Sequence, residues 1–154
     1  MSNAFVQRGG WWVVGQFLLL LAIAGLDLTG QAAIKPLPLF MGGLVLIMVA
    51  TLCSLAGMLA LGRDLTPFPK PSAKAALVQH GIYAYIRHPI YISVFCAAVG
   101  SSLIFQSWPA LVASAVLGIL FDAKARHEER WLRQKFPDYP GYERRVRRFI
   151  PCIY

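Results

Sequence analysis

Residues able to do chemistry gather in two short segments of the chain. The first runs from Gly81 to Tyr91 and contains the sequence Arg87-His88-Pro89 between tyrosines. A long apolar stretch follows it directly, so its ionisable groups lie at a membrane boundary, where they are unfavourable unless solvated or paired. The segment is therefore a candidate ligand site, although basic and aromatic residues at this position suit a plain membrane-flanking segment equally well.

The second segment is Lys124 to Glu129, with the sequence Lys-Ala-Arg-His-Glu-Glu. On a helix, Lys124 and Glu128 can form an exposed ion pair worth about 0.3 to 0.5 kcal/mol. Taken alone, the segment is typical of a solvated helix surface, with His127 in solvent. Beside the first segment, it would give a pocket with phenols and a proline on one wall and an acid and bases on the other. Such a pocket suits a ligand with an aromatic base, hydroxyls, an ammonium and a carboxylate.

Apolar stretches must position these two segments. Of 154 residues, 57% are hydrophobic and 14% charged, a balance typical of membrane proteins. A bilayer core needs about 20 apolar residues per helix. We expect an all-α polytopic membrane protein, a single domain with four transmembrane helices over residues 9–26, 37–61, 90–105 and 108–121. Gln106, Ser107 and Pro109 mark the bend of a hairpin between the last two spans, which brings residues 88 and 124 into one pocket.

The charge distribution indicates orientation. The net charge is +8, which in a soluble protein would suggest nucleic-acid binding. Here every Lys and Arg except Lys35 falls on one side of the predicted spans, so we expect both termini and the middle loop in the cytosol. The expected partners are the bilayer and a lipid-like small molecule, with no nucleic acid. Four spans form a thin bundle, which is compatible with a homodimer.

The connecting segments also carry local signals. Thr66-Pro-Phe-Pro-Lys-Pro71 favours an extended polyproline-like strand, and Ser72 to Gln79 a short helix capped by Ser72. After the fourth span, the helix is expected to continue from Asp122 to Phe136. No metal-ligand spacing connects the cysteines, and we expect three free thiols at Cys53, Cys96 and Cys152.

Motifs between Gly62 and Pro151 form an ordered set: Thr66-Pro-x-Pro-x-Pro71, Leu77-Val78, Gly81-x-Tyr83-x-x-x-Arg87-His88-Pro89-x-Tyr91, Glu128-Glu129-x-x-Leu132, Tyr139-x-x-Tyr142 and Ile150-Pro151. Together they resemble the isoprenylcysteine carboxyl methyltransferase family and its bacterial relatives. The resemblance implies S-adenosyl-L-methionine as cofactor. It also implies the residues that bind it, in the cytosolic segments 63–91 and 122–154: Leu77, Val78, Gly81, Tyr83, His88, Pro89, Ile90, Tyr91, Glu128 and Glu129.

The resemblance also locates the methyl acceptor. In that family an arginine four residues before the acid faces the acceptor, and here Lys124 holds that position. Lysine is a point charge and lacks the planar two-donor fork that grips a carboxylate, so Arg126 or Arg87 are candidates to replace it. The candidate catalytic residues are thus Lys124 and Arg126, orienting an anionic acceptor, with Glu128 and Arg87. A second departure is Phe136-Pro-Asp-Tyr139, where the family more often has Phe-Gly and a longer spacer.

The resemblance implies S-adenosylmethionine-dependent methyl transfer to an amphiphilic, membrane-embedded acceptor, with a carboxylate favoured as in isoprenylcysteine O-methylation. A carboxylate is already nucleophilic and needs no base. Three alternatives stay open. A lipid amine or hydroxyl acceptor would need a base such as His88 or Glu128. A sterol-reductase-like membrane protein would bind NADPH. A non-catalytic membrane subunit would use its basic tail, Arg144 to Arg148, for a lipid or partner contact, and we expect that tail at the membrane surface in any case.

Overall fold

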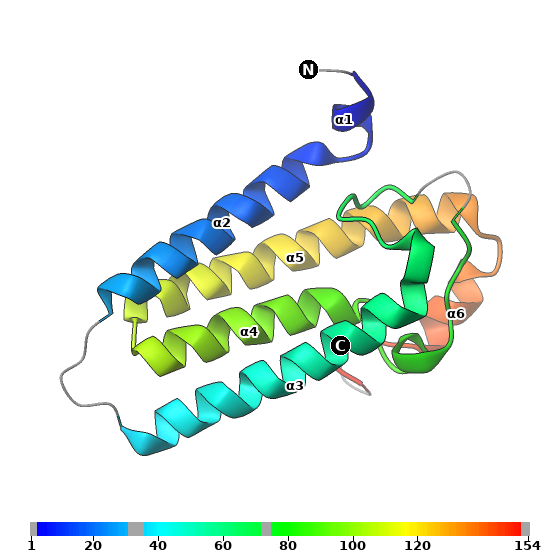
Figure 1. Ribbon diagram of the computed structural model, residues 1–154. Coiled ribbons are helices and arrows are strands. Elements are labelled where there is room, and N and C mark those ends of the chain that lie inside the picture. Colours follow the sequence, from blue (N-terminus) through cyan, green and yellow to red (C-terminus); the bar gives the residue numbers. More distant parts are fainter. Residues whose placement is uncertain (1–2, 31–35, 72–74, 152–154) are drawn as a thin grey trace.

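Four long helices lying side by side form the body of the molecule (Figure 1). The computed structural model describes residues 3–30, 36–71 and 75–151. The long helices are α2 (Gly10–Thr29), α3 (Leu37–Leu61), α4 (Pro89–Phe105) and α5 (Trp108–Lys135). Short elements accompany them: α1 (Asn3–Gln7), α6 (Tyr139–Arg145) and the 3-10 turns η1 (Gly62–Asp64) and η2 (Gly81–Ala84). The expectation of an all-helical protein is confirmed for the described residues, which contain one isolated parallel bridge, Ile86 to Arg147.

Three segments are long and apolar enough to cross a bilayer: Gly10–Thr29, Leu37–Asp64 and Trp108–Lys135. Their outward side chains, such as Leu21, Leu59 and Ile119, are more than half exposed, as a surface facing lipid requires. α4 is equally apolar but has 17 residues, about 25 Å at roughly 1.5 Å per residue, less than the bilayer core of about 30 Å. The chain is an integral membrane protein by these features, and the fourth span stays a prediction.

The predicted hairpin is confirmed. α4 ends at Phe105, Gln106 adopts a left-handed conformation with φ 54°, and α5 begins at Trp108. Ser107 caps the new helix, because its Oγ accepts a hydrogen bond from the Ala110 amide at 3.3 Å, and Pro109 occupies the first turn. The same helix then continues past the apolar stretch to Lys135, as the sequence indicated.

Small residues let the helices approach closely. A Cβ added at Gly43 of α3 would lie 2.6 Å from the Gly100 carbonyl oxygen of α4, and one at Gly100 would lie 2.8 Å from the Gly43 oxygen. The two backbones therefore touch at this crossing. On the other side of α4, Ile23, Ala98, Leu117 and Phe121 form a buried core shared with α2 and α5.

The first span extends further than the predicted residues 9–26. α2 continues through Asp27, whose side chain is buried and accepts a hydrogen bond from Ser101 Oγ at 2.8 Å. A charge-bearing residue is tolerated in an apolar helix when it faces the bundle interior and finds a polar partner. A local hydropathy pattern cannot predict such a partner, because it lies 74 residues away in the sequence.

The helix predicted over residues 72–79 is wrong in its described part, because residues 75–79 are not helical. Backbone groups of this segment form hydrogen bonds with side chains from other segments instead. Lys135 Nζ donates to the Ala75 oxygen at 2.9 Å, and the Ala76 amide donates to Asp64 at 3.3 Å. Residues 66–71 are non-helical as predicted but bend over 67–70. Three residues used in the predictions, Lys35, Ser72 and Cys152, lie outside the described residues, while Cys53 and Cys96 are free thiols as expected.

The C-terminal segment packs against the segment that precedes α4. The Arg87 amide donates to the Arg147 oxygen at 2.9 Å, and the His88 amide donates to the Arg148 oxygen at 3.1 Å. Tyr139, Tyr142 and Val146 form a second buried cluster there. The two segments that carry the candidate chemistry, together with the tail, therefore meet at one end of the bundle (Figure 1).

Candidate active site

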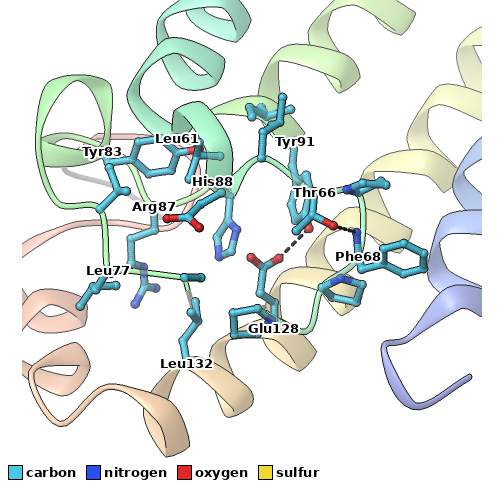
Figure 2. Close-up of a pocket in the computed structure, with 18 of the residues that line it drawn as sticks. Leu61, Thr66, Phe68, Leu77, Tyr83, Arg87, His88, Tyr91, Glu128 and Leu132 are labelled. Atoms are coloured by element: carbon cyan, nitrogen blue, oxygen red, sulfur yellow. Dashed lines mark hydrogen bonds between the residues drawn. The ribbon is translucent and has the colours of Figure 1, made fainter. Parts of the chain in front are cut away.

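A cavity of about 400 Å³ lies where these segments meet the bundle (Figure 2). Its volume falls within the range of about 300 to 1,000 Å³ typical of small-molecule sites. Tyr83, Arg87 and Tyr142 line it from the segments outside the long helices. Other lining residues, including Met58 and Val94, come from the apolar helices. The cavity therefore joins a polar region to an apolar one formed by the long helices.

An aromatic stack forms one wall. The rings of His88 and Tyr91 stack with centroids 5.2 Å apart, and Tyr91 stacks in turn on Phe121 at 5.1 Å. Pro89 starts α4, so residues 88 and 91 fall on the same side of its first turn. Tyr91 Oη donates a 2.6 Å hydrogen bond to Glu128 Oε2, which aims this carboxylate at the cavity from α5 (Figure 2).

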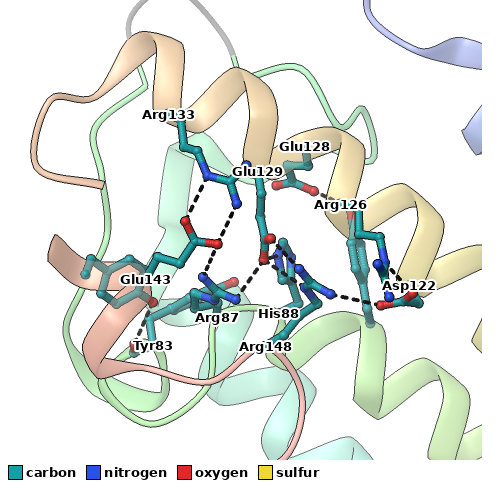
Figure 3. Close-up of polar contacts among 12 residues, drawn as sticks. Tyr83, Arg87, His88, Asp122, Arg126, Glu128, Glu129, Arg133, Glu143 and Arg148 are labelled. Carbon is teal, nitrogen blue, oxygen red and sulfur yellow. Dashed lines mark hydrogen bonds and ion pairs between the residues drawn. The ribbon is translucent and has the colours of Figure 1, made fainter. Parts of the chain in front are cut away.

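The neighbouring carboxylate, Glu129, has different surroundings (Figure 3). It is fully buried and is not among the lining residues. Its Oε1 lies 3.1 Å from His88 Nε2 and 3.2 Å from Arg87 Nη2. Arg148 donates to both oxygens, from Nε at 3.0 Å and from Nη2 at 2.7 Å. Glu129 thus compensates buried cations and holds the His88 ring in place.

The ion pairs extend beyond Glu129 to Glu143 and Asp122. Glu143 accepts two hydrogen bonds from Arg133, at 2.8 and 2.6 Å, and pairs with Arg87 Nη1 at 3.0 Å. The hydrogen bonds from Arg133, and then those from Arg87, lower the pKa of Glu143 although partial burial opposes them. Arg148 Nη1 also reaches Asp122 at 3.1 Å.

The expectation that the Arg144 to Arg148 tail lies at the membrane surface is therefore wrong for Arg148. Its side chain is 14% exposed and is held inside the site by Glu129 and Asp122. The sequence showed only a run of basic residues, and the partners that distinguish Arg148 from its neighbours come from α5. By contrast, Arg145 makes an exposed hydrogen bond to Gln79 at 3.3 Å.

Buried phenols line the polar region of the cavity. Tyr142 Oη donates to the Tyr83 carbonyl oxygen at 2.7 Å. Burial raises the pKa of Tyr83 well above its usual value and the pKa of Tyr142 to about 12, so both are neutral at physiological pH. Within the described residues, Tyr139 Oη and Arg87 Nε are buried without a hydrogen-bond partner, and both side chains line the cavity. Buried polar atoms without a partner are uncommon and occur at functional sites among other places.

Lys124 does not form the exposed pair with Glu128 that its spacing favours. It is 1% exposed, and its Nζ donates to Gln16 Oε1 of α2 at 2.7 Å and lies 4.8 Å from the centre of the Tyr91 ring. α2 comes close to α5 at Gly15, where a Cβ would lie 3.2 Å from Leu120 Cδ1. Gln16 was missed from the sequence, although a lone polar residue inside a predicted span is a signal for a functional contact.

The structure brings most of the predicted site residues together around the cavity: Leu77, Val78, Tyr83, Arg87, His88, Ile90, Tyr91, Lys124 and Glu128 all line it. Four others do not. Gly81 opens η2 with φ 60°, Pro89 packs beside Gly57, and Glu129 lies behind His88. Arg126 is 56% exposed and bonds to Asp122 at 2.7 Å, so it is not placed to take over the role of Lys124.

Some lining or adjacent residues differ from expectation. His127, expected in solvent, packs edge-on against Trp131 at 4.5 Å and tilts toward Trp12 at 5.9 Å. The bent proline segment contributes a wall that the motif alone did not locate. Its lining residues are Leu65, Thr66, Pro67, Phe68, Pro69 and Pro71.

A family model described as phospholipid methyltransferase matches residues 39–139, which include nearly all of α3, all of α4 and α5, and most of the residues that line the cavity. The chain belongs to this family. Within the phospholipid methyltransferase family it is similar to proteins named protein-S-isoprenylcysteine O-methyltransferase. That of Schizosaccharomyces pombe is 38% identical over 79 residues, 50% of this chain and 34% of the relative. That of Arabidopsis thaliana is 30% identical over 115 residues, 72% of this chain and 58% of the relative. The resemblance inferred from the motifs is confirmed.

A bacterial relative matches more of the chain. The cobalt-zinc-cadmium resistance protein of Cupriavidus metallidurans is 29% identical over 152 residues, 94% of this chain and 63% of the relative. The chain thus spans less than two thirds of each of these relatives. A solved structure of a eukaryotic intramembrane Ras methyltransferase, an isoprenylcysteine carboxyl methyltransferase, superposes with a TM-score of 0.69 at 23% identity. The superposition covers 99% of this chain and 53% of the solved methyltransferase chain, so the two proteins share a fold.

Proposed function

We propose that this protein transfers a methyl group from S-adenosylmethionine to the carboxylate of an amphiphilic molecule in the bilayer. The observation that carries the proposal is that Glu128 and the His88–Tyr91 stack share one cavity with apolar residues of the long helices. The similarity to isoprenylcysteine O-methyltransferases supports the reaction class, and a prenylated cysteine is the acceptor that these relatives suggest.

The residues around the cavity fit the proposed cofactor. Glu128 offers a carboxylate to a positively charged group, and Tyr83, Tyr91 and His88 offer aromatic surfaces. The buried, unpartnered Tyr139 Oη and Arg87 Nε are suited to the cofactor's own carboxylate or hydroxyls. S-adenosylmethionine supplies a methyl group activated on a sulfonium sulfur.

The protein's part in this reaction is to bind and orient, because a carboxylate acceptor is already nucleophilic and needs no base. Holding the reacting groups in a near-attack geometry can supply several kcal/mol of the barrier reduction, on the order of 7 to 11 in well-oriented intramolecular cases. The stacked His88, Tyr91 and Phe121 rings give a stiff wall for that purpose. Glu129 and its arginines keep His88 fixed.

Lys124 favours an anionic acceptor over an amine. It contributes a buried positive charge to the cavity surface. A lipid ammonium would meet this charge unfavourably, whereas a carboxylate would satisfy it. We therefore place the acceptor carboxylate near Lys124 and its apolar part along Met58, Val94 and Phe121.

The proposal includes an orientation. With four spans and the basic residues on the cytosolic side, the cavity would open to a cytosolic cofactor at one end and to the bilayer at the other. α4 would then reach across the membrane with help from its flanking residues. Cysteine labelling from either side of sealed vesicles tests this arrangement.

Titration of detergent-solubilised protein with S-adenosylhomocysteine tests the cofactor site. We expect saturable binding that is lost in His88→Ala and Glu128→Ala but kept in Asp138→Asn, which neutralises an exposed acid outside the cavity. A parallel titration with NADPH tests the reductase alternative. A folded protein that binds neither molecule would favour a non-catalytic membrane subunit.

A further inference from the structure

The contact between Lys124 and Gln16 joins residues 108 positions apart and lies at the cavity. Gln16 belongs to α2, outside the region matched by the family model. It is the polar residue nearest the start of a largely apolar helix, where a polar side chain is expected to face a partner. Both Gln16 and Lys124 line the cavity, so their contact shapes the surface that a ligand would touch.

The surroundings of the Lys124 ammonium are sparse. An ammonium has three N–H donors. Among the described residues, Gln16 Oε1 accepts one of them at 2.7 Å, and the face of the Tyr91 ring lies 4.8 Å away. No carboxylate of the described residues lies within 4.0 Å of this nitrogen. A buried charge with so little compensation is unfavourable unless an anion completes it.

Gln16 also determines where Lys124 does not go. Glu128 is four residues further along α5 and lines the same cavity, and a lysine–glutamate pair at this spacing forms readily on a helix. The amide oxygen of Gln16 draws the flexible lysine toward α2, while the Tyr91 hydroxyl occupies Glu128. Since the amide is neutral, it holds the ammonium without cancelling its charge.

We propose that Gln16 is a positioning residue that holds the Lys124 ammonium apart from Glu128, so that one positive charge is kept for the acceptor carboxylate. This inference rests on the proposed function in assigning Lys124 to the acceptor and Glu128 to the cofactor. The side chain at position 16 then sets the preference for an anionic acceptor.

Two substitutions of Gln16 distinguish the effect of its hydrogen bond with Lys124 from the effect of the Lys124 charge. Gln16→Glu keeps a hydrogen-bond acceptor for Lys124 but cancels its charge. We expect it to raise the KM for S-farnesyl-N-acetylcysteine by about tenfold or more, with kcat and S-adenosylhomocysteine affinity unchanged. Gln16→Leu removes the acceptor, so Lys124 turns to Glu128, and both the KM and the S-adenosylhomocysteine affinity worsen. Gln134→Leu, an exposed position of α5 outside the cavity, is the matched control.

A second measurement does not need turnover. S-farnesyl-N-acetylcysteine and its uncharged primary amide compete for binding, and the ratio of their affinities gives the preference for a carboxylate. We expect the wild-type protein to prefer the carboxylate, and both Gln16 variants to lose the preference while melting within a few degrees of the wild type. Retention of the preference and of the wild-type KM in both folded variants would overturn the inference. So would a wild-type protein without any preference, even one that binds S-adenosylhomocysteine. A preference that depends on Gln16, in a protein without S-adenosylhomocysteine binding, would support the role of Gln16 while the proposed function fails.

Discussion

Two sides of α5 carry adjacent glutamates with different surroundings, and the difference distinguishes the proposed ligand-binding acid from a structural one. On the cavity side, Glu128 accepts one hydrogen bond from within the described residues, from Tyr91. On the tail side, Glu129 is surrounded by Arg87, His88 and Arg148. A buried acid whose partners are already present stabilises the fold, whereas an acid facing a cavity with spare acceptor capacity is suited to a ligand.

Glu129→Gln should have the largest effect and should act on stability. It removes the fully buried carboxylate that pairs with Arg87 and Arg148, which are left with Glu143 and Asp122 as partners. Breaking a buried ion pair in this way is expected to reduce the free energy of unfolding by about 3 to 5 kcal/mol. Thermal melting in detergent measures it. Glu128→Gln is the matched change one residue earlier and should melt close to the wild type. Equal melting temperatures of the two variants would show that Glu129 does not stabilise the fold more than Glu128 does.

Glu128→Gln should weaken ligand binding rather than reduce stability. Loss of a charge-assisted contact is worth about 1.5 to 3 kcal/mol, so S-adenosylhomocysteine affinity should fall by about 10- to 150-fold. Isothermal titration calorimetry on the folded variant measures this. Unchanged affinity in Glu128→Gln, with a loss in a Glu129→Gln protein that is still folded, would reverse the assigned roles.

Tyr91→Phe tests how much the hydrogen bond from Tyr91 to Glu128 contributes to cofactor binding. It removes the hydrogen bond to Glu128 but keeps the ring that stacks on His88 and Phe121. The net value of such a bond, about 0.5 to 1.5 kcal/mol, predicts a 2- to 12-fold weaker S-adenosylhomocysteine affinity. The same titration measures it. A loss as large as that of Glu128→Gln would mean that the hydroxyl itself binds the ligand.

Arg133→Met should have the smallest effect. Its pair with Glu143 is well aligned, but the arginine side chain is 44% exposed, and exposed pairs contribute about 1 kcal/mol or less. The melting temperature should change by a few degrees at most. A decrease matching that of Glu129→Gln would show that the outer ion pair, rather than the buried one, stabilises the tail.

Much of the fold could be predicted because its signals are local. Apolar stretches set the four long helices, and Gln106 to Pro109 set the bend between α4 and α5. The predicted helix is wrong for residues 75–79, since its capping signal was local, while the groups that bond to the backbone of Ala75 and Ala76 come from Lys135 and Asp64.

The candidate site was predictable where motifs carry it and not where packing does. His88, Tyr91 and Glu128 line the cavity as expected. The roles of Gln16 and Arg148 depend on which helix packs beside α5 and on where the tail returns. Neither is encoded in residue spacing, so the buried Lys124 and the fully paired Glu129 became evident only in three dimensions.

The most direct test of the account is transfer of a labelled methyl group from S-adenosylmethionine to S-farnesyl-N-acetylcysteine by the purified protein in lipid nanodiscs. We predict a base-labile methyl ester that forms with the wild type and is strongly reduced with Glu128→Gln. A folded protein that binds S-adenosylhomocysteine but forms no such ester, while methylating a lipid amine, would contradict the assignment of a carboxylate acceptor.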